Sequence, residues 1–207
     1  MKKKELALTT LPEVSYMPDS PYNINDVGKL APQEGKIYLL DANVWLFVIR
    51  PPSDLKPYEK AYVDFFEAVL TLASNEKCKA RPLIFLNGLI ISEVYNAFMK
   101  NSCKAYNDSS GTDLKRKEYR KTDDFKKNLK SIQSDFAAYN SVISGDFNSE
   151  LNPQQILYTL PIHSDYNDHY YYHLAMEKDM IVVTNDGDFD YPGVEIITNN
   201  FRLLKLK

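Results

Sequence analysis

The sequence lacks any apolar run long enough to cross a membrane. Its uninterrupted apolar stretches, such as residues 89–91 and 181–183, are only a few residues long, whereas a membrane helix needs about 20. The lysines at positions 2–4 could begin a secretory signal, but Glu5 and Pro12 follow instead of an apolar segment, so the pattern does not fit one. We therefore expect no membrane segment and a cytoplasmic location.

Cysteine and glycine are also scarce. Two cysteines, Cys78 and Cys103, form neither a disulfide framework nor a CxxC pair, and we expect both to be free thiols. Seven glycines among 207 residues exclude a glycine-rich chain, while the 44% apolar content, with fifteen tyrosines and ten phenylalanines, is typical of a globular protein. The length suits one α/β domain with a substantial core.

Net charge is only −3, which by itself gives no case for binding nucleic acid. The charges are nevertheless separated, because residues 100–130 hold ten Lys/Arg and five Asp/Glu, leaving an acidic remainder. This segment could follow a phosphate backbone, or it could simply be a solvated helix of mixed charge. The basic residues that we regard as nucleic-acid-binding candidates are Lys115, Arg116, Arg120, Lys121 and Lys127.

Short apolar runs alternate with segments of helical periodicity, which favours a parallel sheet built from βαβ units. The expected strands are residues 37–40, 82–86, 156–160, 180–184 and 194–198. The expected helices are a short one near 43–47, then 58–75, one capped by Asn87 and running through Met99, helical structure within 112–140, and 165–178. Residues 144–152 are expected to form a loop.

Acidic residues recur where ligands are found in open parallel sheets, beyond the carboxyl ends of strands. Asp41 ends the first expected strand, and Asp186 follows the strand at 181–183. Glu93 and Asp168 lie in early turns of helices that could open toward the same edge. Four carboxylates at one point would repel one another, and a hard cation such as Mg²⁺ or Mn²⁺ would resolve this repulsion.

Each of these acids also has a plain structural interpretation. Asp41 could cap a helix, Asp168 could favour a helix dipole, and Asp186 could form a turn. Glu93 could be solvated on its helix. Their joint placement at one sheet edge favours the shared site.

His169 and His173 stand four residues apart, a spacing that can bind Zn²⁺. No glutamate is placed as in HExxH, so an incidental pair in a tyrosine-rich helix is the preferred interpretation.

The acidic segments resemble those of the PIN-domain family, found in metal-dependent nucleases and in toxins of toxin–antitoxin pairs. The resemblance lies in Leu40-Asp41-Ala42-Asn43, Ser92-Glu93-Val94-Tyr95-Asn96, and Asp168 with the downstream Thr184-Asn185-Asp186-Gly187-Asp188-Phe189. It covers roughly residues 36–200 and implies a three-layer α/β/α fold with a central parallel sheet. It also implies that Mg²⁺ or Mn²⁺ is held by Asp41, Glu93, Asp168 and Asp186, with Asn43, Thr184, Asn185 and Asp188 in support.

The resemblance further implies cleavage of RNA, with DNA as an alternative, and partners such as an antitoxin-like protein or a second copy of the chain. Departures from compact toxins are an N-terminal extension over residues 1–36 and a helical insertion at about 103–150. The domain itself is expected over residues 37–200, followed by a C-terminal tail at 201–207. Two rivals stay open at this point. One is a non-catalytic scaffold that binds RNA or protein, and the other is an unrelated phosphohydrolase, for which Asp would be expected at the position of Asn43.

Overall fold

The computed structural model describes residues 20–49, 55–144, 151–162 and 164–207. In these residues six strands form one sheet in the order β1-β6-β5-β2-β3-β4, and every neighbouring pair is parallel. The strands are β1 (Asn23–Asp26), β2 (Ile37–Leu40), β3 (Leu83–Phe85), β4 (Ile143–Ser144), β5 (Met180–Val183) and β6 (Glu195–Thr198). The predicted α/β fold with a central parallel sheet is confirmed.

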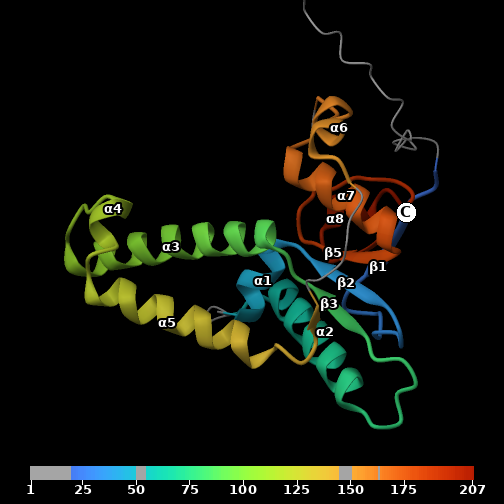
Figure 1. The fold of residues 1–207 in the computed structure, drawn as a ribbon, viewed down its shortest axis with the longest axis horizontal. Helices are drawn as coiled ribbons and strands as arrows, with labels where there is room; N and C mark the ends of the chain where they lie inside the picture. Colours follow the sequence, from blue (N-terminus) through green and yellow to red (C-terminus); the bar gives the residue numbers. More distant parts are fainter. Residues whose placement is uncertain (1–19, 50–54, 145–150, 163) are drawn as a thin grey trace, which may run out of the picture.

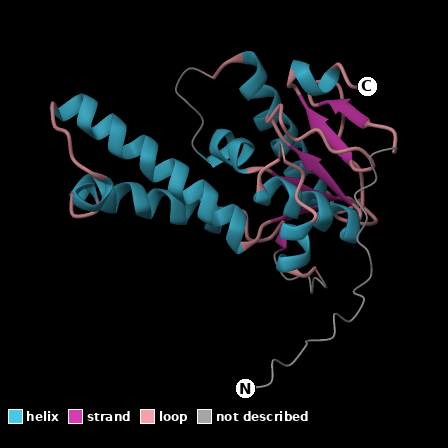
Figure 2. Cartoon of the chain, turned by 90° about the horizontal axis from the view of Figure 1, so that it is seen from above, coloured by secondary structure: helices cyan, strands magenta, loops and turns pink. Residues whose placement is uncertain are grey.

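Helices cover both faces of the sheet, which makes three layers (Figures 1 and 2). They are α1 (Ala42–Ile49), α2 (Pro57–Ser74), α3 (Gly88–Ser110), α4 (Arg116–Tyr119), α5 (Asp123–Ala138), α6 (Pro153–Tyr158), α7 (Tyr166–Lys178) and α8 (Phe201–Leu204). Crossover connections between parallel strands are right-handed. Helices α1 to α5 connect β2 to β3 and β3 to β4 in one direction along the sheet, so they lie on one face. Helices α6 and α7 connect β4 back to β5 in the other direction, so they lie on the opposite face. No helix of the described ranges is long and apolar enough to traverse a bilayer.

The two central strands explain where a site can form. β2 and β5 are neighbours, and Leu39 and Val182 are fully buried in them, as expected of strands covered on both faces. From β2 the chain continues toward β3, whereas from β5 it continues toward β6 on the opposite side. The connections therefore diverge and leave a crevice beyond the carboxyl ends of β2 and β5, where ligands bind in open α/β sheets.

A long helical hairpin, formed by α3 and α5 with α4 near its tip, projects from the body (Figures 1 and 2). Asn87 caps α3 as predicted, since its side chain accepts a hydrogen bond from the Ile90 amide at 2.9 Å. The helix was expected to run through Met99, but it continues to Ser110 and ends at Gly111, whose φ of 65° is the left-handed cap conformation. No glycine or proline interrupts it earlier.

Trp45 joins the base of this hairpin to the body. Its ring lies 5.8 Å from that of Phe66 on α2 and 5.3 Å from that of Phe136 on α5. The side chain is fully buried, so the expectation that Trp45 belongs to the core is confirmed. Buried aromatic contacts of this kind dominate core energetics, and they hold α5 against α1 and α2.

The strand expected at residues 156–160 is wrong, because the chain forms α6 there. Asn152 provides the cap, accepting hydrogen bonds from the amides of Gln154 at 2.9 Å and Gln155 at 3.4 Å. Pro153 occupies the first helical turn, where its missing N–H costs nothing. Local capping chemistry therefore outweighed the short apolar run that had suggested a strand.

The ends of the domain also differ from expectation. The predicted extension contains β1, an edge strand paired with β6, so the sheet begins before residue 37. The predicted tail contains α8, and its Leu203 is fully buried. β4, paired with β3, was not predicted because two residues carry no recognisable period. Residues 1–19 of the extension and 145–150 of the expected loop lie outside the described residues.

Candidate functional site

Asp41 is the first residue after β2, and its carboxylate is held from several sides. One oxygen, Oδ2, accepts hydrogen bonds from the Thr184 hydroxyl at 2.7 Å and from the Asn43 amide at 2.5 Å. The other, Oδ1, accepts one from the Ala42 amide at 2.5 Å. The side-chain oxygen of Asn43 in turn accepts a hydrogen bond from the backbone N–H of Asn185 at 3.2 Å. The loops after β2 and β5 are thus tied together at the predicted edge, through the predicted supporting residues Asn43, Thr184 and Asn185.

The Thr184 hydroxyl also positions the loop that follows β5. It donates to Asp41 and accepts a hydrogen bond from the Asp186 amide at 2.9 Å. The Asp186 carboxylate accepts one from the Asp188 backbone amide at 2.9 Å, so Asp186 forms a turn. Its charge also raises the pKa of Asp41, and its role as a metal ligand stays a prediction.

Tyr62 on α2 links the loops after β5 and β6 through hydrogen bonds of its hydroxyl. Its hydroxyl donates to the Thr184 carbonyl at 3.0 Å and accepts a hydrogen bond from the Asn199 amide at 2.7 Å. It also lies 3.3 Å from the Thr198 hydroxyl. Burial raises the pKa of Tyr62 to about 12, so it stays a protonated donor. The sequence assigned Tyr62 only to an apolar helix face, because a tyrosine in a core pattern does not reveal what its hydroxyl binds.

Glu93 is held by two residues of α7 that the sequence did not identify. The Asn167 amide donates to its Oε1, and the Tyr171 hydroxyl donates to its Oε2 at 2.8 Å. Because α3 and α7 lie on opposite faces of the sheet, these bonds close the crevice from both sides. Burial, followed by the neighbouring Glu93 charge, raises the pKa of Tyr171 far above its usual value, so its proton stays on the hydroxyl. The i, i+4 spacing of Asn167 and Tyr171 was the available clue, since it places both on one face of α7.

The predicted carboxylates act on one another electrostatically. Burial is the main reason that the pKa of Asp41 rises to about 6, and the charges of Asp186 and Glu93 raise it further. Burial likewise raises the pKa of Asp168 to about 8, with added contributions from the charges of Asp165, Asp41, Asp186 and Glu93. The four predicted acids therefore share one partly buried region, together with Asp165, which also caps α7.

The donor set fits a hard divalent cation, because it consists of carboxylate, amide and hydroxyl oxygens. The pKa values of Asp41 and Asp168 are raised mainly by burial and further by the charges of neighbouring acids, and a cation would offset the cost of charging these groups. Across the described ranges, however, no three His, Cys, Asp or Glu side chains are grouped closely enough to hold one ion. The carboxylates of Asp41, Glu93 and Asp186 accept hydrogen bonds, so binding of a shared ion would require side-chain rotation.

Other predicted residues lie elsewhere. Asp188 is exposed, and its carboxylate pairs with Arg202 at 2.9 Å instead of facing Asp41. The candidate basic residues are all exposed, and most of them flank α4, near the hairpin tip and away from the sheet (Figure 1). These are Lys115, Arg116, Arg120, Lys121 and, further along α5, Lys127. They do not surround the carboxylates.

The histidine pair belongs to the core. His169 and His173 are buried, and their Nε2 atoms lie 3.0 Å apart. The Thr159 hydroxyl lies 3.1 Å from the His169 Nε2. Burial lowers the pKa of His173 to about 4, so it is neutral at pH 7. In the part of the chain that the structure covers, no third His, Cys, Asp or Glu joins them as a metal ligand.

Comparison with known proteins adds no relative. No protein-family model matches the sequence, no curated protein matches it, and no solved structure matches the fold. The geometry of the sheet edge and the motifs of the sequence are therefore the features that bear on the function of this chain.

Proposed function

We propose that the protein is a metal-dependent nuclease that hydrolyses phosphodiester bonds of RNA. The observation that supports the proposal is that the charges of four acids near the carboxyl ends of β2 and β5 act on one another: Asp41, Glu93, Asp168 and Asp186. Acidic residues gathered beside a like-charged phosphodiester make sense only if a cation neutralises both. The PIN-like motifs of the sequence support the same chemistry, and an RNA substrate fits the proposed cytoplasmic location.

The site residues have two roles in this proposal, binding the cation and orienting the carboxylates that bind it. Bound Mg²⁺ or Mn²⁺ would supply a water of lowered pKa and would screen the charge of the phosphodiester. Asp41 is kept in one orientation by Thr184 and Asn43, and Glu93 by Tyr171 and Asn167. Such partners of ligating carboxylates fix ligand geometry and contribute strongly to metal affinity. Asp168, in the first turn of α7, and Asp186, in the loop after β5, would complete the set of oxygen donors.

The test compares Asp41→Asn and Asp186→Asn with Asp64→Asn in Mn²⁺ and labelled single-stranded RNA. Asp64 is a suitable control because it is an exposed acid on α2 paired with Lys60 at 2.7 Å. We expect each site variant to lower the cleavage rate by roughly 100-fold or more, while Asp64→Asn stays near wild type. Circular dichroism of each variant confirms that the fold is retained.

Titration calorimetry with Mn²⁺ separates the rival functions. Saturable binding that weakens in Asp41→Asn, together with cleavage, supports the nuclease. Absence of both binding and cleavage would assign the fold to a non-catalytic scaffold. Hydrolysis of small phosphoesters without RNA cleavage would instead favour a phosphohydrolase. Equal cleavage by wild type and both site variants removes the proposed site.

A further inference from the structure

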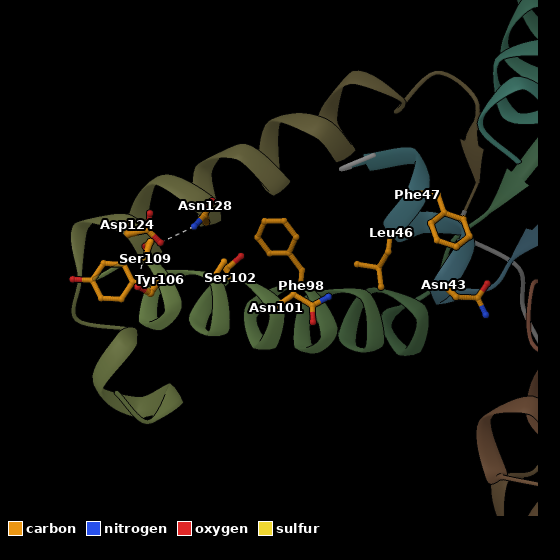
Figure 3. Close-up of a pocket in the computed structure, with 11 residues that line it drawn as sticks. Asn43, Leu46, Phe47, Phe98, Asn101, Ser102, Tyr106, Ser109, Asp124 and Asn128 are labelled. Atoms are coloured by element: carbon orange, nitrogen blue, oxygen red, sulfur yellow. Dashed lines mark hydrogen bonds between the residues drawn. The ribbon is translucent and has the colours of Figure 1, made fainter. Parts of the chain in front are cut away.

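A groove of about 670 Å³ runs between α1, α3 and α5, beside the hairpin (Figure 3). One end is lined by Asn43, whose amide also holds the Asp41 carboxylate at 2.5 Å. The other end is lined by Tyr106, Asp124 and Asn128 near the hairpin tip. The groove therefore begins at the carboxylate site and leads away from it, and its size is in the range of ligand-binding sites.

The groove surface combines aromatic rings with amides. Along α3 the lining residues include Phe98, Asn101 and Tyr106, which helical spacing places on one side of the helix. Asn43 and Asn128 also line the groove from α1 and α5, with side-chain amides that are hydrogen-bonded to Asp41 and to Asp124. Aromatic side chains stack on unpaired bases, and an amide such as that of Asn101 offers a donor and an acceptor to base edges. The surface is therefore suited to flat, polar-edged rings.

Charges are distributed around the groove and not along its floor. Asp124 is the only ionisable acid or base among the described lining residues apart from Tyr106, and its carboxylate is engaged by the Tyr119 hydroxyl at 2.7 Å and Asn128 at 2.9 Å. The surrounding segment of residues 100–130 carries ten cations against five acids. Its exposed Lys127 lies three residues after Asp124 and so beside the groove.

We propose that this groove binds unpaired nucleotides of a single-stranded RNA whose adjacent phosphodiester lies at the carboxylate site, an assignment that rests on the proposed function. A neutral aromatic and amide floor with a cationic margin matches bases turned inward and phosphates turned outward. A duplex would not fit this chemistry, because its bases are stacked on one another. The excess of cations along the hairpin favours a nucleic acid over a peptide as the occupant.

The test uses fluorescence anisotropy of a labelled 12-nucleotide single-stranded RNA with the full chain in EDTA, so that binding is measured without cleavage. Ala105→Glu adds a negative charge in the groove at an exposed helical position. Gln133→Glu is the matched control, because it adds the same charge to an exposed position of α5 on the helix face opposite Asp124. We expect Ala105→Glu to weaken binding on the order of tenfold and Gln133→Glu to have little effect.

A second pair of variants examines stacking. Tyr106→Ala should weaken binding by roughly fivefold or more. Tyr106→Phe should keep nearly wild-type affinity, since the ring and not the hydroxyl provides the stacking surface. Far-ultraviolet circular dichroism checks that α3 is intact. A duplex of the same sequence should bind more weakly than the single strand.

The outcomes distinguish this assignment from the proposed function. Weaker RNA binding by Ala105→Glu and Tyr106→Ala, but not by the controls, supports the groove even if no cleavage occurs with Mn²⁺. Wild-type affinity in both groove variants overturns the groove while leaving the nuclease intact. A wild-type chain that binds no single-stranded RNA also overturns it, and the groove would then be better suited to a peptide.

Discussion

The sheet edge and the hairpin groove place their charges in opposite ways. At the sheet edge, acids are partly buried, raise one another's pKa values and are held by hydrogen bonds from several segments. In the groove the floor is largely neutral, and the cations lie on the exposed surface around it. A buried charge is useful where it meets a counter-ion, whereas exposed charges attract a polyanion without a large desolvation cost.

The two regions also differ in how they depend on the fold. The sheet-edge residues come from four distant segments, so a lost hydrogen bond there disturbs the joins between strands and helices. Most groove residues lie within the local span 98–128 on a hairpin that projects from the body (Figure 2). Changes at the sheet edge should therefore affect both stability and catalysis, while changes along the hairpin should affect binding alone.

The largest expected effect is the pH-dependent cost of burying Asp168 beside other acids. Its pKa is about 8 in the folded protein against an ordinary value of 3.8, so the folded state holds the proton more tightly. Stability from this group is complete below pH 4 and is lost as the pH rises toward 8. In EDTA, we expect the unfolding free energy of Asp168→Asn relative to that of wild type to rise by about 3 kcal/mol between pH 4.5 and pH 8.5.

Chemical denaturation at several pH values measures this gain. Adding Mn²⁺ at pH 8 should stabilise wild type more than the variant, because an ion offsets the same repulsion. If the unfolding free energies of the two proteins change with pH in the same way, the pKa of Asp168 is not raised in the folded state.

Next in size is the loss of the Tyr62 hydroxyl. Tyr62→Phe removes its hydrogen bonds to the Thr184 carbonyl and the Asn199 amide at a fully buried position. We expect a loss of about 2 kcal/mol in unfolding free energy, measured in urea. Tyr58→Phe, whose half-buried hydroxyl contacts Glu59 at 3.2 Å, is the control and should cost less than about 1 kcal/mol. Equal losses would deny Tyr62 its organising role.

A smaller effect is expected at Tyr171, which holds Glu93 at 2.8 Å without itself being proposed as a ligand. Tyr171→Phe should lower Mn²⁺ affinity and the cleavage rate by roughly tenfold while the fold is retained. Calorimetry and RNA cleavage measure the two effects. Tyr170→Phe, the neighbouring substitution, should leave both near wild type, and the same loss in both variants would contradict a specific role for the hydroxyl that binds Glu93.

The smallest effect concerns the margin of the groove. Lys127→Ala should weaken single-stranded RNA binding by about threefold and reduce the salt dependence of binding by about one charge. Lys126→Ala is the matched control, because Lys126 is already paired with Asp123 at 2.8 Å. Anisotropy titrations over a range of salt concentrations compare the two. A larger effect at Lys126 would place the RNA on another face of α5.

Much of the fold was predictable because local patterns and long-range packing agreed. The strands at 37–40 and 180–184 were recognised from apolar runs that are buried on both faces, and α2 from its apolar face. The prediction failed at residues 156–160, where Asn152 and Pro153 start a helix. It also missed β1 and β4, because edge strands this short become strands only through their partners.

The sequence by itself determined the alternation of the central strands with helices, and it indicated the acids of the proposed site, since apolar runs, helical patterns and strand-end positions are local properties. Only the tertiary structure decided which groups hold those acids. Tyr62, Asn167 and Tyr171 reach the site across large sequence separations, and Asp188 turns away to Arg202. The physical reason is that a hydrogen bond needs an orientation in space, which is fixed only when the sheet and both helical layers have packed together.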